Sequence, residues 1–398
     1  MASASGLILG IESSCDETAA AVVERGSRTL SSVVASQIAT HARFGGVVPE
    51  LASREHLRAI VPVVRAAIAE AGVSFDDIDA IAVTSGPGLA GALLVGITYA
   101  KALAFARNLP LVAVNHLEGH IHAVLLEERQ SAPEGASHDE PALALVVSGG
   151  HTHLYLAEPA HGAWRYRLIG RTLDDAAGEA YDKVAKLLGL GYPGGPWIDA
   201  MARFGDPKAV PFAFAQIKAK AHLHGKAPRT KAAKTAPIAD LDPHFLFSFS
   251  GIKTAVLRHV ELNGMRVGVN ERIAKMLAGA RPPKTKDEAL ALAPQPVLDM
   301  IASFQHAVVG DLMKKTFAAA ETLGATRILV TGGVAANREL RERFTAEAQR
   351  RRVRVSFPTL ALSTDNAAMI AAAAWPRFQA GEFAASALSA EPSLALGV

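Results

Sequence analysis

The sequence predicts an α/β protein built from two similar halves, and three observations support this. Short apolar runs typical of strands alternate with longer segments of helical periodicity, and polar or glycine-rich turns follow several of the runs. Each half opens on two apolar runs joined by a short polar turn, the pattern of a hairpin. A length of 398 residues is long for one domain. We therefore expect two α/β lobes, residues 1–130 and 141–398, with ligands at the carboxyl ends of the strands.

The first half predicts a hairpin followed by alternating helices and strands. Its helix over 53–72 opens on Ser53 and stops at Gly72, residue types that favour helix starts and ends. The predicted elements are, in order, strands 7–11 and 19–23, helix 53–72, a strand in DAIAVTSGPG, helix 88–106, and strand 111–114 leading into a helix. Residues 129–141, rich in small and acidic residues with two prolines, predict a loop between the halves.

The second half opens on a second hairpin and continues with more helix. Asp174 or Asp175 is placed to cap its first helix, which Gly189 and Gly191 would end. The other predicted elements are, in order, strands 143–147 and 153–157, a helix with Asp199 at its start, an extended piece and helix in 245–260, a long helix in 294–322, strand 327–330, a helix after TGGVAAN, a strand in VRVSFP, and a small-residue helix after Asp365.

The composition favours a cytoplasmic protein. Half of the residues are hydrophobic and the mean hydropathy is +0.20, which is ample for a large core. A single cysteine, Cys15, excludes an intramolecular disulfide framework and fits a reducing compartment. The N-terminus lacks the basic region of a secretory signal. Segment 88–106 approaches the length of a membrane span, but Lys101 within it and the Gly-Pro-Gly turn before it favour a buried helix, so we expect no membrane contact.

The stretch LVAVNHLEGH carries the strongest candidate for a metal site. Asn115 is suited to capping a helix, and His116 and His120 follow it four residues apart, so both project from one helical face and can share a metal ion. The spacing alone is a weak signal in a chain with 14 histidines, and two histidines satisfied by backbone or solvent are the simpler alternative. Gly119 between them is a poor helix former, which favours a constrained site.

Two hairpin turns, ESSCDET and SGGHT, are candidates for binding a nucleotide. Backbone N–H groups in such turns form anion-binding concavities, and Gly149 and Gly150 allow close approach of a ligand. The alternative is a pair of ordinary hairpins. Further on, Asp182 and Asp199 flank a Pro-Gly-Gly turn, where contact with sugar hydroxyls is reasonable, although acidic helix faces are usually only solvated.

A basic segment lies within residues 207–240. It has no acidic residue between Pro207 and Ala239 but contains seven lysine and arginine residues, which predicts a solvated loop. Such a run is most often only a solubilising surface. It also suits contact with the phosphates of RNA, which requires charge rather than a defined fold.

Taken together, these motifs resemble the TsaD family of tRNA threonylcarbamoyladenosine biosynthesis proteins. They follow the family's order along nearly the whole chain. The matching stretches are IESSCDET, GGVVPELASREH, GPGLAGALLVG, NHLEGH, LVVSGGHTHL, DDAAGEAYDKVAKLLGLGYPGGP, FSFSGIKT, TGGVAANREL and STDNAAMIA. The resemblance implies an actin-like ATPase fold of the actin/Hsp70/sugar-kinase class, two duplicated α/β lobes with the ligand cleft between them.

The resemblance also implies a reaction and a ligand set. The threonylcarbamoyl group of threonylcarbamoyl-AMP is transferred to N6 of the adenosine next to the anticodon in tRNAs reading ANN codons, and AMP is released. One divalent metal ion per subunit, iron(II) or alternatively zinc, would be held by His116, His120 and Asp365. The residues implied to contact the adenylate or nucleoside are Val146, Val147, Ser148, Gly149, Gly150, Asp182, Gly195, Asp199 and Asn337.

The chemistry itself needs no protein nucleophile, because the mixed acyl-phosphate anhydride is already activated. The enzyme must position the amine, stabilise the oxyanion and favour departure of AMP. We hypothesise that Asp16 or Glu17 accepts the amine proton, and that Cys15 is a packed residue rather than a nucleophile.

The family implies tRNA, a TsaB-like paralogue in a heterodimer and a TsaE-like ATPase as partners, and neither DNA nor a membrane. The segments near 218–240 and 262–297 look longer and more basic than the leaner bacterial pattern, which leaves the alignment of the tRNA-facing region open.

Three other readings compete with the transferase. An ATP-dependent sugar kinase of the same fold would phosphorylate a small hydroxylated substrate, and a non-catalytic nucleotide-switched scaffold would only hold partners. Family members were long described as O-sialoglycoprotein endopeptidases, but a zincin helix needs a glutamate directly after its first histidine. Here that position is Leu117.

Overall fold

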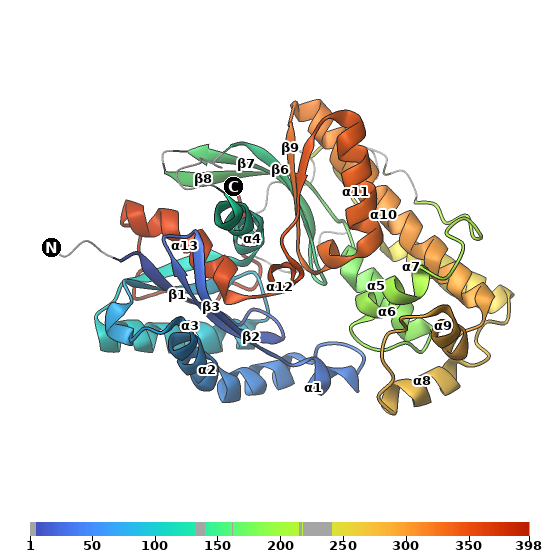
Figure 1. The fold of residues 1–398 in the computed structure, drawn as a ribbon, viewed down its shortest axis with the longest axis horizontal. Helices are drawn as coiled ribbons and strands as arrows, with labels where there is room; N and C mark the ends of the chain where they lie inside the picture. The colour runs from blue at the N-terminus through green and yellow to red at the C-terminus, as the bar shows by residue number, and fades with distance from the viewer. Residues whose placement is uncertain (1–4, 133–139, 161, 215–216, 218–240, 398) are drawn as a thin grey trace.

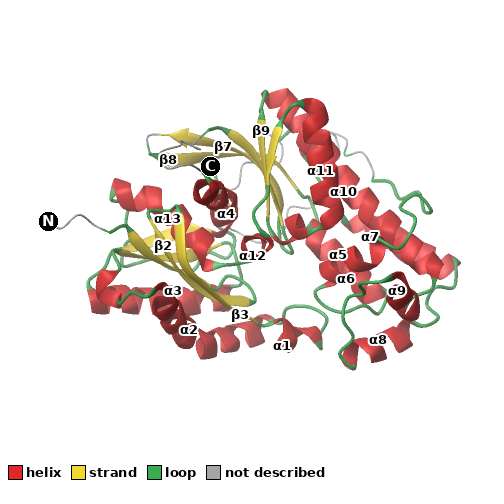
Figure 2. Ribbon diagram, viewed as in Figure 1, coloured by secondary structure: helices red, strands yellow, loops and turns green. Residues whose placement is uncertain are grey.

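The chain folds into two lobes, each built on a five-stranded mixed sheet (Figures 1 and 2). The computed structural model describes residues 5–132, 140–160, 162–214, 217 and 241–397. The first sheet has the order β3-β2-β1-β4-β5, and the second has the order β8-β7-β6-β9-β10. The strands are β1 (Leu7–Glu12), β2 (Glu17–Glu24), β3 (Arg28–Ser36), β4 (Ala80–Gly86), β5 (Leu111–Asn115), β6 (Ala142–Val147), β7 (Thr152–Ala160), β8 (Ala163–Arg171), β9 (Arg327–Thr331) and β10 (Arg354–Ser356).

The two sheets share one topology. In each, the first three strands form an antiparallel meander, and the last two run parallel to its first strand. The predicted hairpins are therefore β1–β2 and β6–β7, and the prediction of two duplicated α/β lobes is confirmed. The third meander strands, β3 and β8, were not predicted. Both are edge strands with partly exposed residues, so their sequences contain no continuous apolar run.

Helices cover both faces of each sheet. The α-helices are α1 (Ile38–Ala42), α2 (Pro49–Ala71), α3 (Ala90–Arg107), α4 (His116–Ser131), α5 (Ala177–Leu187), α6 (Gly194–Ala202), α7 (Ser250–Leu262), α8 (Val269–Leu277), α9 (Lys286–Leu292), α10 (Gln295–Leu323), α11 (Arg338–Arg351), α12 (Leu360–Ser363) and α13 (Ala367–Ala380). Short 3-10 helices lie at Phe75–Asp77, Pro243–Phe245 and Gly333–Ala336.

Helix α4 lies between the two sheets (Figure 1). Its Ala123 and Leu126 pack in the core under the first sheet, whereas its Leu117, Ile121 and Val124 pack in the core under the second. Every residue from His116 to Leu126 is buried. The helix that carries the two candidate metal ligands is thus fixed by both lobes at once.

Helix α13, near the C-terminus, packs on the first sheet. Its residues Ala367–Ala374 share a core with Ile8 of β1 and Val112 and Val114 of β5. The chain after α13 then follows the first lobe, because the N–H of Ala384 donates to Leu111 O at 2.7 Å. The predicted boundary between the two lobes, residues 1–130 and 141–398, stays a prediction. Helix α13 falls in the second of these ranges but packs on the first sheet.

Helix α3 corresponds to the predicted apolar segment 88–106. Among the described residues it is the helix whose length and composition would suffice to cross a membrane, and 33% of that stretch is buried in the fold. The buried side chains of Leu93, Ile97 and Ala100 pack against the first sheet.

Some predicted helix ends are wrong. Helix α2 begins at Pro49 rather than Ser53, because a proline fits the first helical position and the Ser53 hydroxyl instead donates to Pro49 O within the first turn. Helix α6 begins at Gly194, so Asp199 lies in its second turn rather than at its start.

The predicted cap of α5 is also wrong, because this helix has no side-chain cap. Asp174 instead accepts hydrogen bonds from the Ser248 hydroxyl, the Phe249 N–H and the Ser250 hydroxyl at 2.5–2.7 Å. It therefore ties the β8–α5 loop to the start of α7.

Candidate active site

His116 and His120 lie on one face of α4 and meet Asp365, which comes from the loop before α13. Asp365 Oδ1 lies 3.6 Å from His116 Nε2 and 3.2 Å from His120 Nε2. One potential ligand atom from each residue falls within 4.8 Å of the others. The first turn of α4 is fixed by Asn115, whose Oδ1 accepts from the N–H of Leu117 at 2.9 Å, as its predicted capping role requires.

Asp365 is free to face the histidines because its neighbour caps the helix. Asn366 Oδ1 accepts from the N–H of Met369 at 3.0 Å, so it performs the N-cap role for α13. The two neighbouring residues therefore divide the roles of helix cap and candidate ligand.

The three residues suit a divalent metal ion. His120 is fully buried, and neither of its ring nitrogens has a hydrogen bond of good geometry among the described residues. Two imidazoles and one carboxylate leave coordination positions open, as in iron(II) facial triads and catalytic zinc sites. Burial disfavours the charged form of His116, but Asp365 and Glu12 outweigh it and raise its pKa to about 9. A cation is therefore favoured at this position.

The turn of the first hairpin carries Asp16, which is buried, and Glu17. His56 supports this turn, because its Nε2 lies 3.0 Å from Cys15 O and its Nδ1 lies 2.7 Å from the Thr18 hydroxyl. The charge of Asp16 acts on Asp182 of the second lobe, and that of Asp365 acts on Asp16. Asp16 is thus within electrostatic range of both the candidate metal ligand Asp365 and Asp182.

Asp16 and Glu17 interact as a pair of neighbouring carboxyl groups. Burial raises the pKa of both, and the neighbouring charge of Asp16 helps to raise that of Glu17 to about 9. Glu17 therefore keeps its proton at neutral pH and can donate a hydrogen bond to Asp16.

Replacing Glu17 with glutamine should stabilise the protein at alkaline pH. In the folded protein Glu17 stays protonated until about pH 9, whereas in the unfolded chain it ionises near its ordinary value of 4.5. Between these values the folded state binds more protons, so the wild type loses stability as pH rises. Scanning calorimetry should show a melting temperature for the variant about 2–4 °C above the wild type near pH 8, and almost no difference near pH 4.5. An equal shift at both pH values would contradict the assignment.

The second hairpin turn lies beside the metal triad. The ring centroid of His151 is 6.2 Å from that of His116, and Ser148 N–H donates to His151 O at 2.8 Å. Gly149 and Gly150 are exposed and have open space where a side chain would be. This turn therefore presents backbone donors to a ligand close to the triad.

Two members of the predicted substrate loop, Val146 and Val147, could reach a ligand through their backbone only. Val146 and Val147 are fully buried, and their side chains enter the cores on opposite faces of the second sheet.

The remaining predicted substrate residues lie together on α5, α6 and α11. Asp182 Oδ1 accepts from the N–H of Gly194, at the start of α6, at 2.7 Å. Gly195 follows in that first turn and has no atom within 4 Å of where a side chain would begin. Asp199 lies one turn further along the same helix.

Gln305 of α10, which the sequence analysis missed, joins Asp199 to Asn337. Its Nε2 donates to Asp199 Oδ1 at 3.2 Å, and its Oε1 accepts from Asn337 Nδ2 at 2.7 Å. Asn337 also caps α11 by accepting from Leu340 N–H. No local motif marks Gln305, because it lies inside a long helix. Glu12 and His151, also missed, do stand in recognisable positions within the two hairpin turns.

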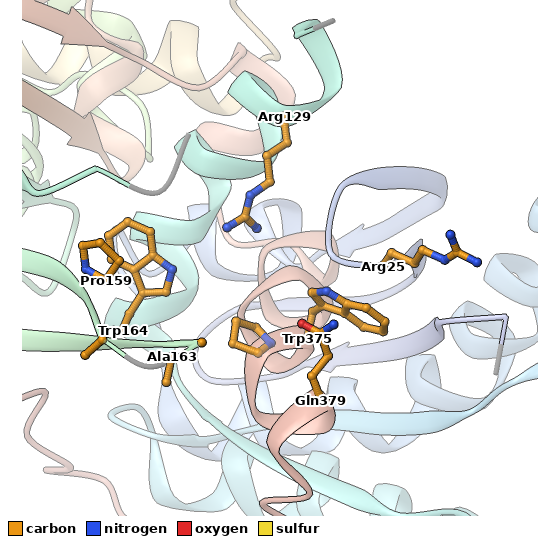
Figure 3. Close-up of a pocket in the computed structure, with 10 residues that line it drawn as sticks. Arg25, Arg129, Pro159, Ala163, Trp164, Trp375 and Gln379 are labelled. Atoms are coloured by element: carbon orange, nitrogen blue, oxygen red, sulfur yellow. The ribbon is translucent and has the colours of Figure 1, made fainter. Parts of the chain in front are cut away.

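A separate cavity of about 350 Å³ lies away from this site (Figure 3). The indoles of Trp164 and Trp375 stand on opposite sides of it, and the Arg129 side chain points toward it. Arg129 Nη1 donates to Gly26 O at 3.2 Å. No predicted site residue lines this cavity, so it is distinct from the candidate active site. The basic segment predicted over 207–240 falls mostly outside the described residues, which omit 215–216 and 218–240.

Comparison with known proteins identifies the chain. A family model for TsaD, tRNA N6-adenosine threonylcarbamoyltransferase, matches residues 28–372. This chain belongs to the TsaD family. A family relative from Koribacter versatilis (strain Ellin345) is 60% identical and aligns over 99% of this chain and 100% of its own length. Another from Symbiobacterium thermophilum is 48% identical over 99% of this chain and 98% of its own.

Family membership confirms the predicted function. The protein is a transferase that carries out threonylcarbamoyladenosine modification of tRNA, at N6 of adenosine. Its duplicated lobes have the actin-like ATPase fold expected of the family. The sugar-kinase, scaffold and endopeptidase alternatives are set aside.

Solved structures are matched more distantly. YeaZ from Pseudomonas aeruginosa is 22% identical with a TM-score of 0.27, covering 41% of this chain and 64% of that chain. HypF from T. kodakarensis is 14% identical with a TM-score of 0.47, covering 97% of this chain and 49% of that one. No inference about partners follows from likenesses of this strength.

Proposed function

We propose that His116, His120 and Asp365 hold one divalent metal ion, and that transfer from threonylcarbamoyl-AMP to the tRNA adenosine takes place beside it. The observation that carries this proposal is the convergence of three elements. The triad comes from α4 and from the loop before α13, which packs on the first sheet. The glycine turn of the second lobe approaches this triad, with 6.2 Å between the ring centroids of His116 and His151.

The metal is iron(II) in this proposal, with zinc as the alternative. When bound, it would act as a Lewis acid that polarises the threonylcarbamoyl carbonyl. The imidazoles of His116 and His120 and the carboxylate of Asp365 supply its ligands. Both histidines are buried on α4, and Asp365 is partly buried beside them.

The adenylate half of the donor lies across the second lobe. The backbone of residues 146–150 binds its phosphate and acyl region, and the N–H groups beside Gly149 and Gly150 face it. Asp182, Gly195 and Asp199 contact the ribose, with Asn337 beside the base. Gln305 fixes the side chains of Asp199 and Asn337 relative to each other by hydrogen bonds to both.

Asp16 accepts the proton of the adenosine amine. It is the better acceptor of the pair, because Glu17 keeps its own proton at neutral pH. As the amine attacks the carbamoyl carbon, the bond to the phosphate oxygen breaks, and AMP leaves with the electron pair. Cys15 takes no part, since burial and the charge of Asp16 raise the pKa of its thiol well above its usual range.

The partners stay proposals of the same kind. Family resemblance supports a TsaB-like paralogue bound through the first lobe, a TsaE-like ATPase and a cytoplasmic location. The basic composition of residues 207–240 supports contact with tRNA phosphates.

Metal removal tests the proposal. After anaerobic treatment with a chelator, the rate of threonylcarbamoyl transfer should fall at least about 100-fold, because no metal ion is left to polarise the carbonyl. Adding iron(II) or zinc back should restore it in the wild type but not in a His120→Ala variant. Full turnover by protein shown by elemental analysis to be metal-free would contradict the proposal.

A further inference from the structure

We propose that Glu12 is the positioning residue that orients His116 toward the metal ion. The proposal rests on the metal site proposed above and assigns a role to a residue outside its ligand set. Glu12 ends strand β1 and is fully buried. Its carboxylate lies within hydrogen-bond distance of His116, a candidate metal ligand, rather than being paired with a lysine or arginine among the described residues.

The two ring nitrogens of His116 face different partners. Nδ1 lies 3.2 Å from Glu12 Oε2 and 3.2 Å from the Ser14 hydroxyl, whereas Nε2 faces Asp365 Oδ1 at 3.6 Å. A carboxylate can only accept, so Glu12 fixes the proton on Nδ1. Nε2 is then the nitrogen left for the metal, because it faces Asp365 and the metal position, and its lone pair becomes available when a metal ion displaces its proton. Such a carboxylate–histidine pair orients a ligand and raises its basicity.

Glu12 is itself rigidly held. The Thr84 hydroxyl of β4 donates to Oε2 at 2.6 Å, and the Ser14 N–H donates to Oε1 at 2.5 Å. Both oxygens are therefore occupied, and the carboxylate cannot rotate away from His116. Because β1 and β4 are paired at the centre of the first sheet, this arrangement connects the orientation of His116 to the most buried part of the lobe.

The second histidine has no equivalent. Among the described residues His120 Nδ1 has no hydrogen-bond partner, although it is as deeply buried. The first lobe thus orients one imidazole of the pair in advance. Loss of Glu12 should weaken the metal site without removing a ligand.

Cobalt(II) titration of the purified full chain, followed by visible absorption, tests this role. The Glu12→Gln variant should bind cobalt(II) about 10- to 100-fold more weakly than the wild type. Glu118→Gln is the matched control. Glu118 is also a buried glutamate, on the same helix as the ligands, but its carboxylate pairs with Arg377 at 2.7 Å instead. This control should keep wild-type affinity within about twofold.

A second spectroscopic readout, ¹⁵N NMR, separates positioning from simple stability. In the zinc-loaded wild type, ¹⁵N NMR should show His116 protonated at Nδ1, with that N–H in a strong hydrogen bond to the Glu12 carboxylate. In Glu12→Gln the Nδ1–H signal should move toward the position of a weaker hydrogen bond, because a neutral amide is a poorer acceptor than a carboxylate. If Glu12→Gln fails to fold, Thr84→Val removes one donor to the carboxylate and should weaken cobalt(II) binding several-fold.

The outcomes discriminate between the two proposals. Wild-type affinity in Glu12→Gln, or in Thr84→Val when the former does not fold, would overturn the role of Glu12. An equal loss in Glu12→Gln and Glu118→Gln would also overturn it, as a general effect of a buried substitution. Wild-type affinity in His120→Ala would instead show that the metal site itself is wrong.

Discussion

Replacing Asp365 with asparagine should lower the rate of threonylcarbamoyl transfer by about 1000-fold and abolish stoichiometric metal binding. Asp365 Oδ1 is the oxygen that faces both His116 and His120, at 3.6 and 3.2 Å. The amide has nearly the same size but no charge, so the ligand set loses its only anion. Initial rates and elemental analysis on the same preparation measure both effects.

The neighbouring residue gives a matched control. Asn366→Ala removes the cap of α13 and should cost about 1 kcal/mol of folding stability, while most of the metal binding remains. The opposite pattern, with metal retained in Asp365→Asn and lost in Asn366→Ala, would mean that the loop acts through helix geometry rather than through ligation.

Replacing Asp16 with asparagine should reduce transfer by about 100- to 10,000-fold, the range expected for loss of a general base. The structure favours Asp16 over Glu17, because a Glu17 carboxyl that stays protonated at neutral pH cannot accept the amine proton. The loss should appear in the maximal rate, with little change in the Michaelis constant for the donor. Single-turnover kinetics with saturating tRNA measure this step.

Two neighbours of Asp16 act as controls. Glu17→Gln should keep much more activity, since glutamine can still donate to Asp16 as the protonated carboxyl does. Cys15→Ala should also stay active, because the buried thiol is not ionised. If Asp16→Asn kept the full rate while Glu17→Gln lost it, the two assignments would have to be exchanged.

Much of the fold follows from local patterns. The hairpins β1–β2 and β6–β7 and the cap at Asn115 depend on residues close together in sequence, and the structure has all of them. His116 and His120 are likewise neighbours on one helix. These features could be predicted because strand alternation, turn residues and helix periodicity are short-range properties.

Other features depend on distant contacts and have no local signature. Asp365 reaches α4 only because α13 folds back onto the first sheet, a long-range contact that no local pattern predicts. Gln305 gains its position from the packing of α10 beside α6 and α11. The incorrect cap at Asp174 has the same cause, since Ser248 and Ser250 compete successfully for its carboxylate.

Nucleoside mass spectrometry of tRNA tests the central claim most directly. Purified wild type and Asp365→Asn would each be incubated with threonylcarbamoyl-AMP, unmodified tRNA and TsaB-like and TsaE-like partners, and the digested tRNA then analysed for threonylcarbamoyladenosine. We expect the modified nucleoside with the wild type and essentially none with Asp365→Asn. Equal amounts from both proteins would contradict a catalytic role for the metal site formed by His116, His120 and Asp365.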